Sequence, residues 1–235
     1  MKNIASAIMA IGAHHDDNEL VAGALAKHKN AGWHVVSVVM TDGRYALGKS
    51  SEENIQLREK ESLDAAALLG MECEFMHLPE GNVYPLEETR NALTNIIRKH
   101  QPAIVITHPA KDYHIDHMNT SRSVLEAVYS CESVHGRGEY PPCPKPFLYY
   151  SDAWFTPFEP DEYVDISNFI NLKLDMLRCH KSQIPPDWVE DDNMVGHAKL
   201  QSRTRGIEAG IKYAEAFRFV PLHARLRVSN LLGEK

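Results

Sequence analysis

The sequence lacks long apolar runs. No stretch of its 235 residues reaches the roughly 18 apolar residues that a membrane-spanning helix requires, so no span is predicted. The apolar stretch near the N-terminus runs directly into a cluster of His and Asp, with no separate signal-peptide cleavage region, and we interpret it as a first strand. Together these features predict a cytoplasmic protein.

An excess of positive charge is also missing. The 25 Lys and Arg residues are outnumbered by 32 Asp and Glu, which gives a formal net charge of −7. Because an acidic chain has no electrostatic basis for wrapping nucleic acid or lying on an anionic membrane, we expect neither partner. The hydrophobic content of 43% is that of an ordinary globular protein, and the length suits one domain over residues 1–235.

Several motifs that identify metal-binding or enzyme families are absent. The four cysteines form no CxxC pair, which excludes a zinc ribbon or thioredoxin-like site, and we expect reduced structural thiols. No Gly-x-Gly-x-x-Gly follows the first predicted strand and no Walker A loop occurs, which disfavours a nucleotide-binding Rossmann protein. The Gly-x-Ser-x-Gly elbow of serine hydrolases is missing as well.

Segments of strand and helix character alternate along the chain. Short apolar segments predict strands at residues 4–12, 33–40, 73–78, 103–107 and 147–150. Apolar spacing and capping residues predict helices at residues 20–31, 52–69 with Ser51 as N-cap, 86–100, 119–130, 168–180 and 197–213. The alternation predicts an α/β fold, a Rossmann-like and mostly parallel sheet with helices on both faces. Ligands of such sheets bind beyond the carboxyl ends of strands, so the loops that begin at Ala13 and His108 are the first candidates for a site.

The first of these loops carries two histidines followed by two aspartates. His14 and Asp17 are three residues apart in a turn, which lets both side chains converge on one point, and zinc accepts both ligand types. Asp16 can face the open side of the same ion and take a proton from a metal-bound water. The alternative is an Asp that caps the next helix beside solvated histidines. So much negative charge in one turn favours a bound cation.

The second loop places His114 and His117 three residues apart with Asp116 between them. One imidazole can bind metal, the other can act as an imidazolium toward an oxyanion, and Asp116 can hold an imidazole in its useful tautomer. The alternative is a polar surface loop in which Asp116 or Asn119 caps the following helix. Taken together, the two loops predict a His2Asp catalytic metal site with one position open for water.

The paired motifs resemble those of the LmbE-like (PIG-L) family of zinc-dependent N-acetylglucosaminide deacetylases. The family signature Ala-His-Pro-Asp-Asp-x-Glu corresponds to residues 13–19, and His-Pro-Asp-His corresponds to residues 114–117. The resemblance extends to an Arg-x-x-Glu helix at residues 58–61, to the strand–helix order of the first 130 residues, and to segments 180–183 and 214–218. His15 and Ile115 replace the usual prolines and Met118 stands where Arg is common, which leaves the choice of substrate open.

The resemblance implies a role for each matching residue. His14, Asp17 and His117 would bind one Zn²⁺ per chain, although such a site also accepts Fe²⁺. Asp16 would be the general base that activates the water. His114, oriented by Asp116, would stabilise the oxyanion or protonate the leaving amine.

Two further residues are candidates for substrate binding. Arg58 would contact sugar hydroxyls, since its planar fork of donors suits a diol; the alternative is a surface arginine that pairs with Glu61. Tyr113, next to His114, could donate a hydrogen bond to the oxyanion.

These inferences predict hydrolysis of an N-acetyl group from an N-acetylglucosamine-type small molecule, with homo-oligomeric assembly as in relatives of this fold. Two alternatives remain. One is a metal-dependent hydrolase of another amide, an ester or a phosphoester. The other is a non-catalytic sugar- or metal-binding module, against which an intact Asp16 argues, because binding alone does not require a base.

Overall fold

Seven strands and six α-helices make up the computed structural model, which describes residues 6–46, 50–134, 138–154 and 156–222. The strands are β1 (Ala7–Gly12), β2 (His34–Thr41), β3 (Glu72–Leu78), β4 (Ile104–Thr107), β5 (Phe147–Ser151), β6 (Glu162–Asp165) and β7 (Ala214–Val220). The α-helices are α1 (Ala22–Asn30), α2 (Ser51–Leu69), α3 (Glu87–His100), α4 (Ile115–Ser130), α5 (Ile170–Leu177) and α6 (Met194–Glu208). Short 3-10 helices lie at η1 (Asn18–Val21), η2 (Lys181–Gln183) and η3 (Glu190–Asp192).

All seven strands form one sheet in the order β3-β2-β1-β4-β5-β7-β6. The first five strands of that order run parallel, as predicted, which confirms the α/β fold class. The last two, β7 and β6, pair antiparallel with their neighbours and were not predicted as strands. Their sequences place Glu215 and Arg218 in β7 and leave β6 alternately exposed, so neither reads as a buried apolar run.

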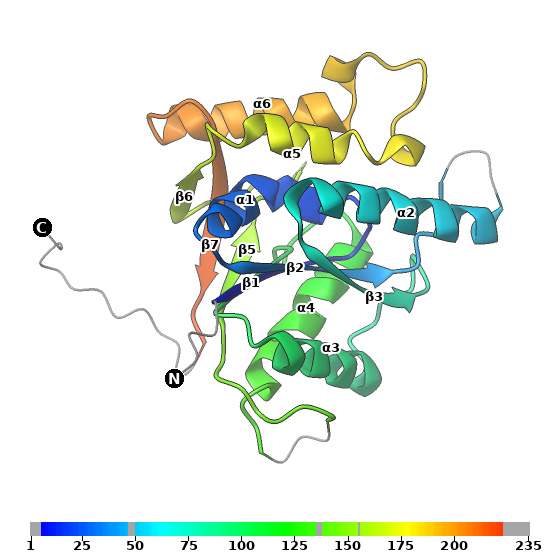
Figure 1. Ribbon diagram of the computed structural model, residues 1–235, viewed down its shortest axis with the longest axis vertical. Helices are drawn as coiled ribbons and strands as arrows, with labels where there is room; N and C mark the ends of the chain where they lie inside the picture. Colours follow the sequence, from blue (N-terminus) through cyan, green and yellow to red (C-terminus); the bar gives the residue numbers. More distant parts are fainter. Residues whose placement is uncertain (1–5, 47–49, 135–137, 155, 223–235) are drawn as a thin grey trace, which may run out of the picture.

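Helices cover both faces of the sheet, with α1 and α2 on one side and α3 and α4 on the other (Figure 1). Successive side chains of a strand point to opposite faces, and β1 therefore contributes to two cores. Ile8 and Ala10 pack with α1 and α2, whereas Met9 and Ile11 pack with α3 and α4. All four are 0–1% exposed, which explains why β1 is apolar throughout.

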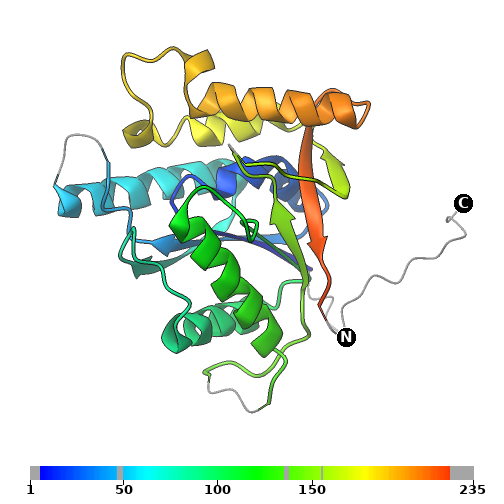
Figure 2. The same ribbon diagram turned by 180° about the vertical axis from the view of Figure 1, so that it is seen from behind.

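Helices α5 and α6 form an outer layer over α1 and α2 (Figures 1 and 2). A buried ion pair joins this layer to the sheet, because Lys173 of α5 lies 2.9 Å from Glu215 of β7. Glu215 also accepts hydrogen bonds from the backbone N–H groups of Gly23 and Ala24 at the start of α1. Glu215 therefore ties α1, α5 and β7 together at one buried point.

The six α-helices begin one to four residues from their predicted starts, and two of these differences concern the residue that caps the helix. Ser50, not Ser51, caps α2, because its hydroxyl accepts from the Glu53 N–H while the Glu53 side chain reaches back to the Ser50 N–H. Helix α4 starts at Ile115, four residues before the predicted start. The His114 side chain caps it, and this places the catalytic candidates of the second loop in the first helical turn. Residues 4 and 5 of the first predicted strand lie outside the described residues.

The order in which strands are added to the sheet changes direction between β1 and β4. From β1 the chain runs outward to β2 and β3, and it then returns to add β4 on the other side of β1. The two strands pair directly, with Ile11 opposite Thr107 at their carboxyl ends. Such a switch point separates the two loops that follow and leaves a crevice between them. The two His- and Asp-containing loops therefore meet, as the fold prediction requires.

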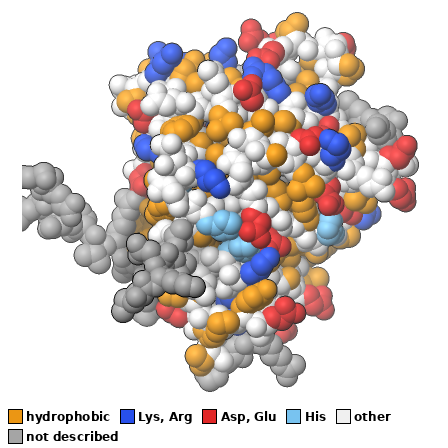
Figure 3. Space-filling model, in the orientation of Figure 1, with side chains coloured by type: hydrophobic (Ala, Val, Ile, Leu, Met, Phe, Trp, Pro, Cys, Tyr) orange, Lys and Arg blue, Asp and Glu red, His pale blue; other side chains and the backbone are white. Residues whose placement is uncertain are grey.

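The surface is mixed in charge. On the face shown in Figure 3, Lys and Arg side chains are interspersed with Asp and Glu, in keeping with the net charge of −7. Among the described helices, none is both long enough and apolar enough to cross a membrane. The four cysteines are free thiols.

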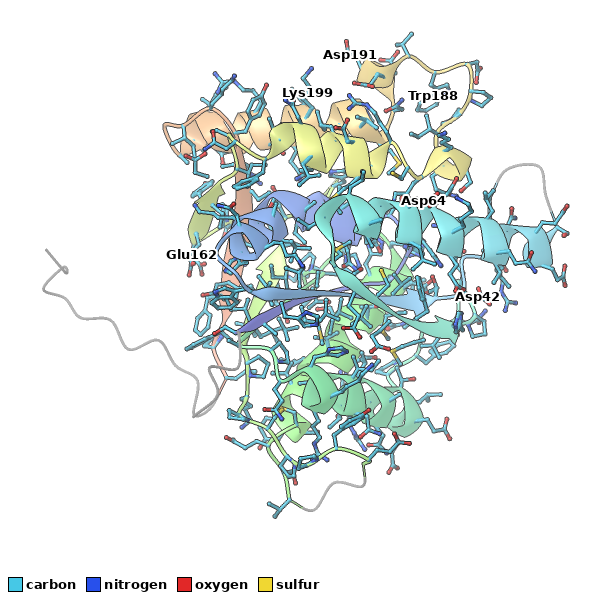
Figure 4. All side chains as sticks on the ribbon, viewed as in Figure 1. Asp42, Asp64, Glu162, Trp188, Asp191 and Lys199 are labelled. Carbon is cyan, nitrogen blue, oxygen red and sulfur yellow. The ribbon has the colours of Figure 1, made fainter. Side chains whose placement is uncertain are left out.

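The Lys173–Glu215 pair gives a test of the packing. We expect Lys173→Met to lower the free energy of unfolding by about 3–5 kcal/mol, because it leaves the Glu215 charge buried without its cation. Urea unfolding followed by circular dichroism measures the change. Lys60→Met is the control, since Lys60 pairs on the surface of α2 with Asp64 (Figure 4) and its loss should leave the unfolding midpoint unchanged. Equal stability of the two variants would contradict the role given to the buried pair.

Candidate active site

A cavity of about 210 Å³ opens at the carboxyl ends of β1 and β4. Seven of the eight predicted site residues line it, and Asp116 lies fully buried behind its wall. These seven are His14, Asp16, Asp17, Arg58, Tyr113, His114 and His117. A larger hollow of about 890 Å³ runs along α4, but none of the predicted site residues lines it. The smaller cavity is therefore the candidate site.

The turn after β1 brings His14 and Asp17 together. The His14 N–H donates to Asp17 Oδ2 at 2.6 Å, which folds the aspartate back over the strand end. Gly12 makes this approach possible, because a Cβ at that position would lie only 2.7 Å from the Cβ of Asp17. The glycine at the end of the apolar strand is thus required by the close turn.

The proposed metal ligands converge from two elements, the turn after β1 and the first turn of α4. His14 Nδ1 lies 3.1 Å from His117 Nε2 and 3.4 Å from Asp17 Oδ2. Asp17 Oδ1 lies 3.5 Å from His117 Nε2. Ligands placed tetrahedrally about 2.0–2.2 Å from a zinc ion are about 3.3–3.6 Å apart, so these separations suit one ion.

A separate carboxylate faces the outer nitrogen of each of these imidazoles. His117 Nδ1 lies 3.0 Å from Asp112 Oδ1, and His14 Nε2 lies 3.5 Å from Asp116 Oδ2. A carboxylate on one nitrogen keeps the proton there and leaves the other nitrogen free to bind metal. Asp112 was not among the predicted site residues; its place in the second His/Asp cluster was the only signal for it.

The predicted contact of Asp116 with His114 exists, but the backbone N–H of Asp116 makes it and the carboxylate does not. The Asp116 carboxylate accepts from the backbone N–H groups of Gly81 and Val83, at 2.7 and 3.2 Å, and faces His14. What joins Asp116 to His114 is its backbone N–H, which donates to His114 Nδ1 at 3.1 Å. The reason is the early start of α4, which turns the Asp116 side chain toward the loop after β3.

The electrostatics of the site favour a positive charge beside Asp17. Burial alone would lower the pKa of His14, but the charge of Asp17 and hydrogen bonds with Asp116 and Asp17 raise it to about 10. Burial would raise the pKa of Asp17, yet the neighbouring imidazoles of His117, His108 and His14 bring it well below its usual range. The protein around this carboxylate therefore stabilises a cation, as a metal site requires.

Asp16 lines the same cavity and is hydrogen-bonded to α2. Its Oδ1 accepts from Arg58 at 3.1 Å, and the same guanidinium contacts both oxygens of Glu80 at 3.1 Å and the Tyr45 carbonyl. Arg58 is 2% exposed, so the alternative of a surface arginine paired with Glu61 is wrong. Arg58 lines the cavity, but its donors already hold Asp16 and Glu80 in place.

His114 and Tyr113 occupy the rim of the cavity. Because His114 Nδ1 accepts from the Asp116 N–H, any proton on the ring resides on Nε2. Burial, together with the nearby His14 and His117, lowers the pKa of His114, which favours a neutral donor over the predicted imidazolium. Tyr113 is half-exposed, and burial with the charges of Asp17 and Asp112 raises its pKa to about 12, so its hydroxyl stays protonated.

His108 supports the site from the end of β4. Its Nε2 lies 3.0 Å from the Ala13 nitrogen and 3.1 Å from Asp17 Oδ2, and its ring stacks on His117 with centroids 4.0 Å apart. An Nε2 that accepts from Ala13 has used its lone pair, and one that donates to Asp17 carries a proton. In either tautomer His108 has no lone pair left on Nε2 for a metal, and the tautomer with its proton on Nε2 also orients Asp17.

Three groups of described residues bring three metal-binding side chains together. Two of them, His14–His114–His117 and Asp17–His108–His117, share His117 and belong to the cavity. The third, His34–Glu72–His100, lies at the opposite edge of the sheet. There the Lys99 ammonium contacts Glu74 and lies 3.7 Å from Glu72, so a protein cation already neutralises those carboxylates.

Comparison with known proteins places these observations in a family. Residues 9–128 match the family model described as PIG-L: GlcNAc-PI de-N-acetylase. Diacetylchitobiose deacetylase of Thermococcus kodakarensis is 27% identical over 224 residues, which cover 91% of this chain and 83% of that protein. The uncharacterized deacetylase YaiS of Escherichia coli is 31% identical over 186 residues, which cover 74% of this chain and 90% of that protein.

Similarity extends to solved structures and to one enzyme with a different activity. The structure of N,N′-diacetylchitobiose deacetylase from Pyrococcus horikoshii superposes with a TM-score of 0.83 at 27% identity, covering 93% of this chain and 85% of that one. The 4-oxalmesaconate hydratase of Pseudomonas putida is 24% identical over 188 residues, which cover 74% of this chain and 73% of that protein. Because the family model matches more than half of the chain, as the motif resemblance predicted, this protein belongs to the PIG-L (GlcNAc-PI de-N-acetylase) family.

Proposed function

We propose that this protein is a metal-dependent N-deacetylase that hydrolyses the acetamido group of an N-acetylglucosamine-type amino sugar or conjugate. The observation that carries the proposal is the convergence of His14, Asp17 and His117 on one point, with Asp16 beside them in the same cavity. The names of the two diacetylchitobiose deacetylases support an amino-sugar substrate. Cytoplasmic location and homo-oligomeric assembly stay predictions from the sequence.

The donor set fits a zinc ion. His14 would bind through Nδ1, His117 through Nε2 and Asp17 through a carboxylate oxygen, because the outer nitrogens of both rings face carboxylates. Two imidazoles and one carboxylate are a ligand set found in catalytic zinc sites. When bound, the metal supplies a Lewis acid that polarises the amide carbonyl and lowers the pKa of a bound water.

The remaining chemistry belongs to the side chains of the cavity. Asp16 would take the proton from the attacking water, and its contact with Arg58 would hold it in position to do so. His114, with its proton on Nε2, would donate to the oxygen that becomes negative. Water adds to the carbonyl carbon, the C–N bond breaks, and the nitrogen leaves as an amine after it gains a proton, which gives acetate and the free amino sugar.

Two other reactions could use the same residues. One is hydrolysis of a different amide, an ester or a phosphoester. The other is addition of water to a carbon–carbon double bond, as the name of the Pseudomonas putida relative describes. Both need a water that is activated by a metal and a base, so only the substrate distinguishes them from deacetylation.

Acetate release tests the reaction directly. We expect the purified protein to release acetate from N-acetylglucosamine conjugates, and to lose that activity with a chelator and regain it with added zinc. The panel should include simple amides, a phosphoester and an unsaturated dicarboxylate as alternatives. Turnover of one of these, with none of the N-acetyl sugars, would contradict the proposed substrate class.

Substitution of Asp16 tests the general base. We expect Asp16→Asn to lower kcat by about a hundredfold or more, because an amide cannot accept the proton. Metal content measured by elemental analysis should stay at the wild-type level, since Asp16 is not among the proposed ligands. Wild-type kcat in this variant would remove Asp16 from the mechanism.

Substitution of Asp112 tests how the site holds His117. We expect Asp112→Asn to weaken zinc binding by about tenfold to a hundredfold, because His117 Nδ1 loses the carboxylate that fixes its proton. Competition with a zinc-binding dye measures the change. His117→Ala should lose the metal altogether, and Asp187→Asn, an exposed residue outside the site, is the matched control. Equal affinity in Asp112→Asn and Asp187→Asn would rule out the positioning role.

A further inference from the structure

The short helix η2 brings one polar side chain to the cavity from the C-terminal part of the chain. Gln183 is the last residue of η2 and lines the cavity together with Asp16, Arg58 and Trp154. It lies outside the two His/Asp loops, and the proposed reaction gives it no role. Its surroundings determine which end of its amide is available to a ligand.

Two buried acids anchor the segment that carries Gln183. His180, which is 0% exposed, lies with Nε2 3.3 Å from Glu19 Oε1. Glu61 of α2 accepts from both the N–H and the hydroxyl of Ser182, at 2.8 and 2.6 Å. Glu19 follows the first His/Asp loop, and Glu61 is one helical turn from Arg58. The segment is therefore fixed to the same elements that hold Asp16.

These hydrogen bonds also set the orientation of the Gln183 amide. A carboxylate has no proton to give, so the Ser182 hydroxyl must donate to Glu61. The oxygen of that hydroxyl then accepts from Gln183 Nε2 at 3.1 Å. With its nitrogen held in this way, the amide leaves its oxygen, Oε1, to accept, and no described residue donates to Oε1. Glu61 thus fixes the Ser182 hydroxyl, and that hydroxyl holds the amide nitrogen of Gln183. Oε1 is therefore the acceptor that this cavity-lining residue offers to a ligand.

We propose that Gln183 is a specificity-determining residue, and that Oε1 accepts a hydrogen bond from a hydroxyl group of the amino-sugar substrate. The inference rests on the proposed function for its substrate class. A sugar ring carries several hydroxyl donors, and a carbonyl oxygen in fixed position selects one of them by geometry. Ser182 and Glu61 are positioning residues, because they act through the amide.

Kinetics of a shape-matched variant test the contact. We expect Gln183→Leu to raise KM about threefold to tenfold and to leave kcat within about twofold, because one neutral hydrogen bond made in ground and transition state is lost. Ser182→Ala should raise KM in the same direction, since the amide is free to turn. Gln56→Leu, the same substitution at an exposed position of α2, is the control and should match the wild type.

Deoxy sugars identify the partner of Oε1 and separate binding from folding. One N-acetylglucosamine analogue that lacks a single hydroxyl should lose affinity with the wild type, yet lose nothing further with Gln183→Leu. If Gln183 had only a structural role, each missing hydroxyl would cost the same affinity in the wild type and in Gln183→Leu. That result, or a wild-type KM in Gln183→Leu, would overturn the inference.

Calorimetry distinguishes failure of this inference from failure of the proposed reaction. Methyl N-acetylglucosaminide is titrated into zinc-loaded Asp16→Asn, with and without Gln183→Leu, so that no turnover is needed. A weaker Kd with the second substitution supports the inference even if the wild type releases no acetate. If the wild type releases acetate but the Kd is the same with and without Gln183→Leu, the inference alone is overturned. If the sugar does not bind at all, both the inference and the substrate class are overturned.

Discussion

The carboxylate of Asp17 is the constraint on which the site depends. It lies in the turn after β1 with its side chain 10% exposed, in contact with His14, His108 and His117, and a charge largely removed from water must be compensated. The pKa of His14 is raised to about 10, so without a metal its imidazolium supplies the counter-charge. A bound metal ion would supply that charge instead, and the proposed ligands would present their lone pairs to that one point.

The arrangement of the outer carboxylates follows from this need. Asp112 faces the outer nitrogen of His117, and Asp116 faces that of His14. Asp112 lies in the loop before α4 and Asp116 in the first turn of that helix. Asp116 is in turn fixed by backbone N–H groups after β3, so three strand ends contribute to one site. Asp42, which follows β2 at the same edge (Figure 4), accepts from the Glu80 N–H and steadies the loop that carries Arg58's partner.

The role of each side chain in the cavity depends on the hydrogen bonds that it already makes. Arg58 is occupied by Glu80, Asp16 and a backbone carbonyl, so in the structure it positions the proposed base. Gln183 is held through its nitrogen, which leaves its amide oxygen as an acceptor, and it lines the same cavity. The proposed base, acceptor and metal ligands therefore come from the turn after β1, from the first turn of α4 and from the segment after α5, which are far apart in the chain.

The sequence by itself determined the parallel part of the sheet, the two loops and the residues within them. It could do so because buried strands such as β1 are apolar over their whole length, and because His and Asp side chains gathered directly after such a strand lie where ligands of parallel sheets bind. The partners of those residues were decided only by the tertiary structure. Asp116 turned to His14 because α4 begins at Ile115, and His108 gained its role by reaching Asp17 across the crevice between two strands. Asp112 contacts His117, five residues further along the chain. The antiparallel strands β6 and β7 escaped prediction for the same reason. Glu215 is stabilised in a buried strand by Lys173 and by the N–H groups of Gly23 and Ala24, all of them more than 40 residues away, so the local sequence does not reveal its partners.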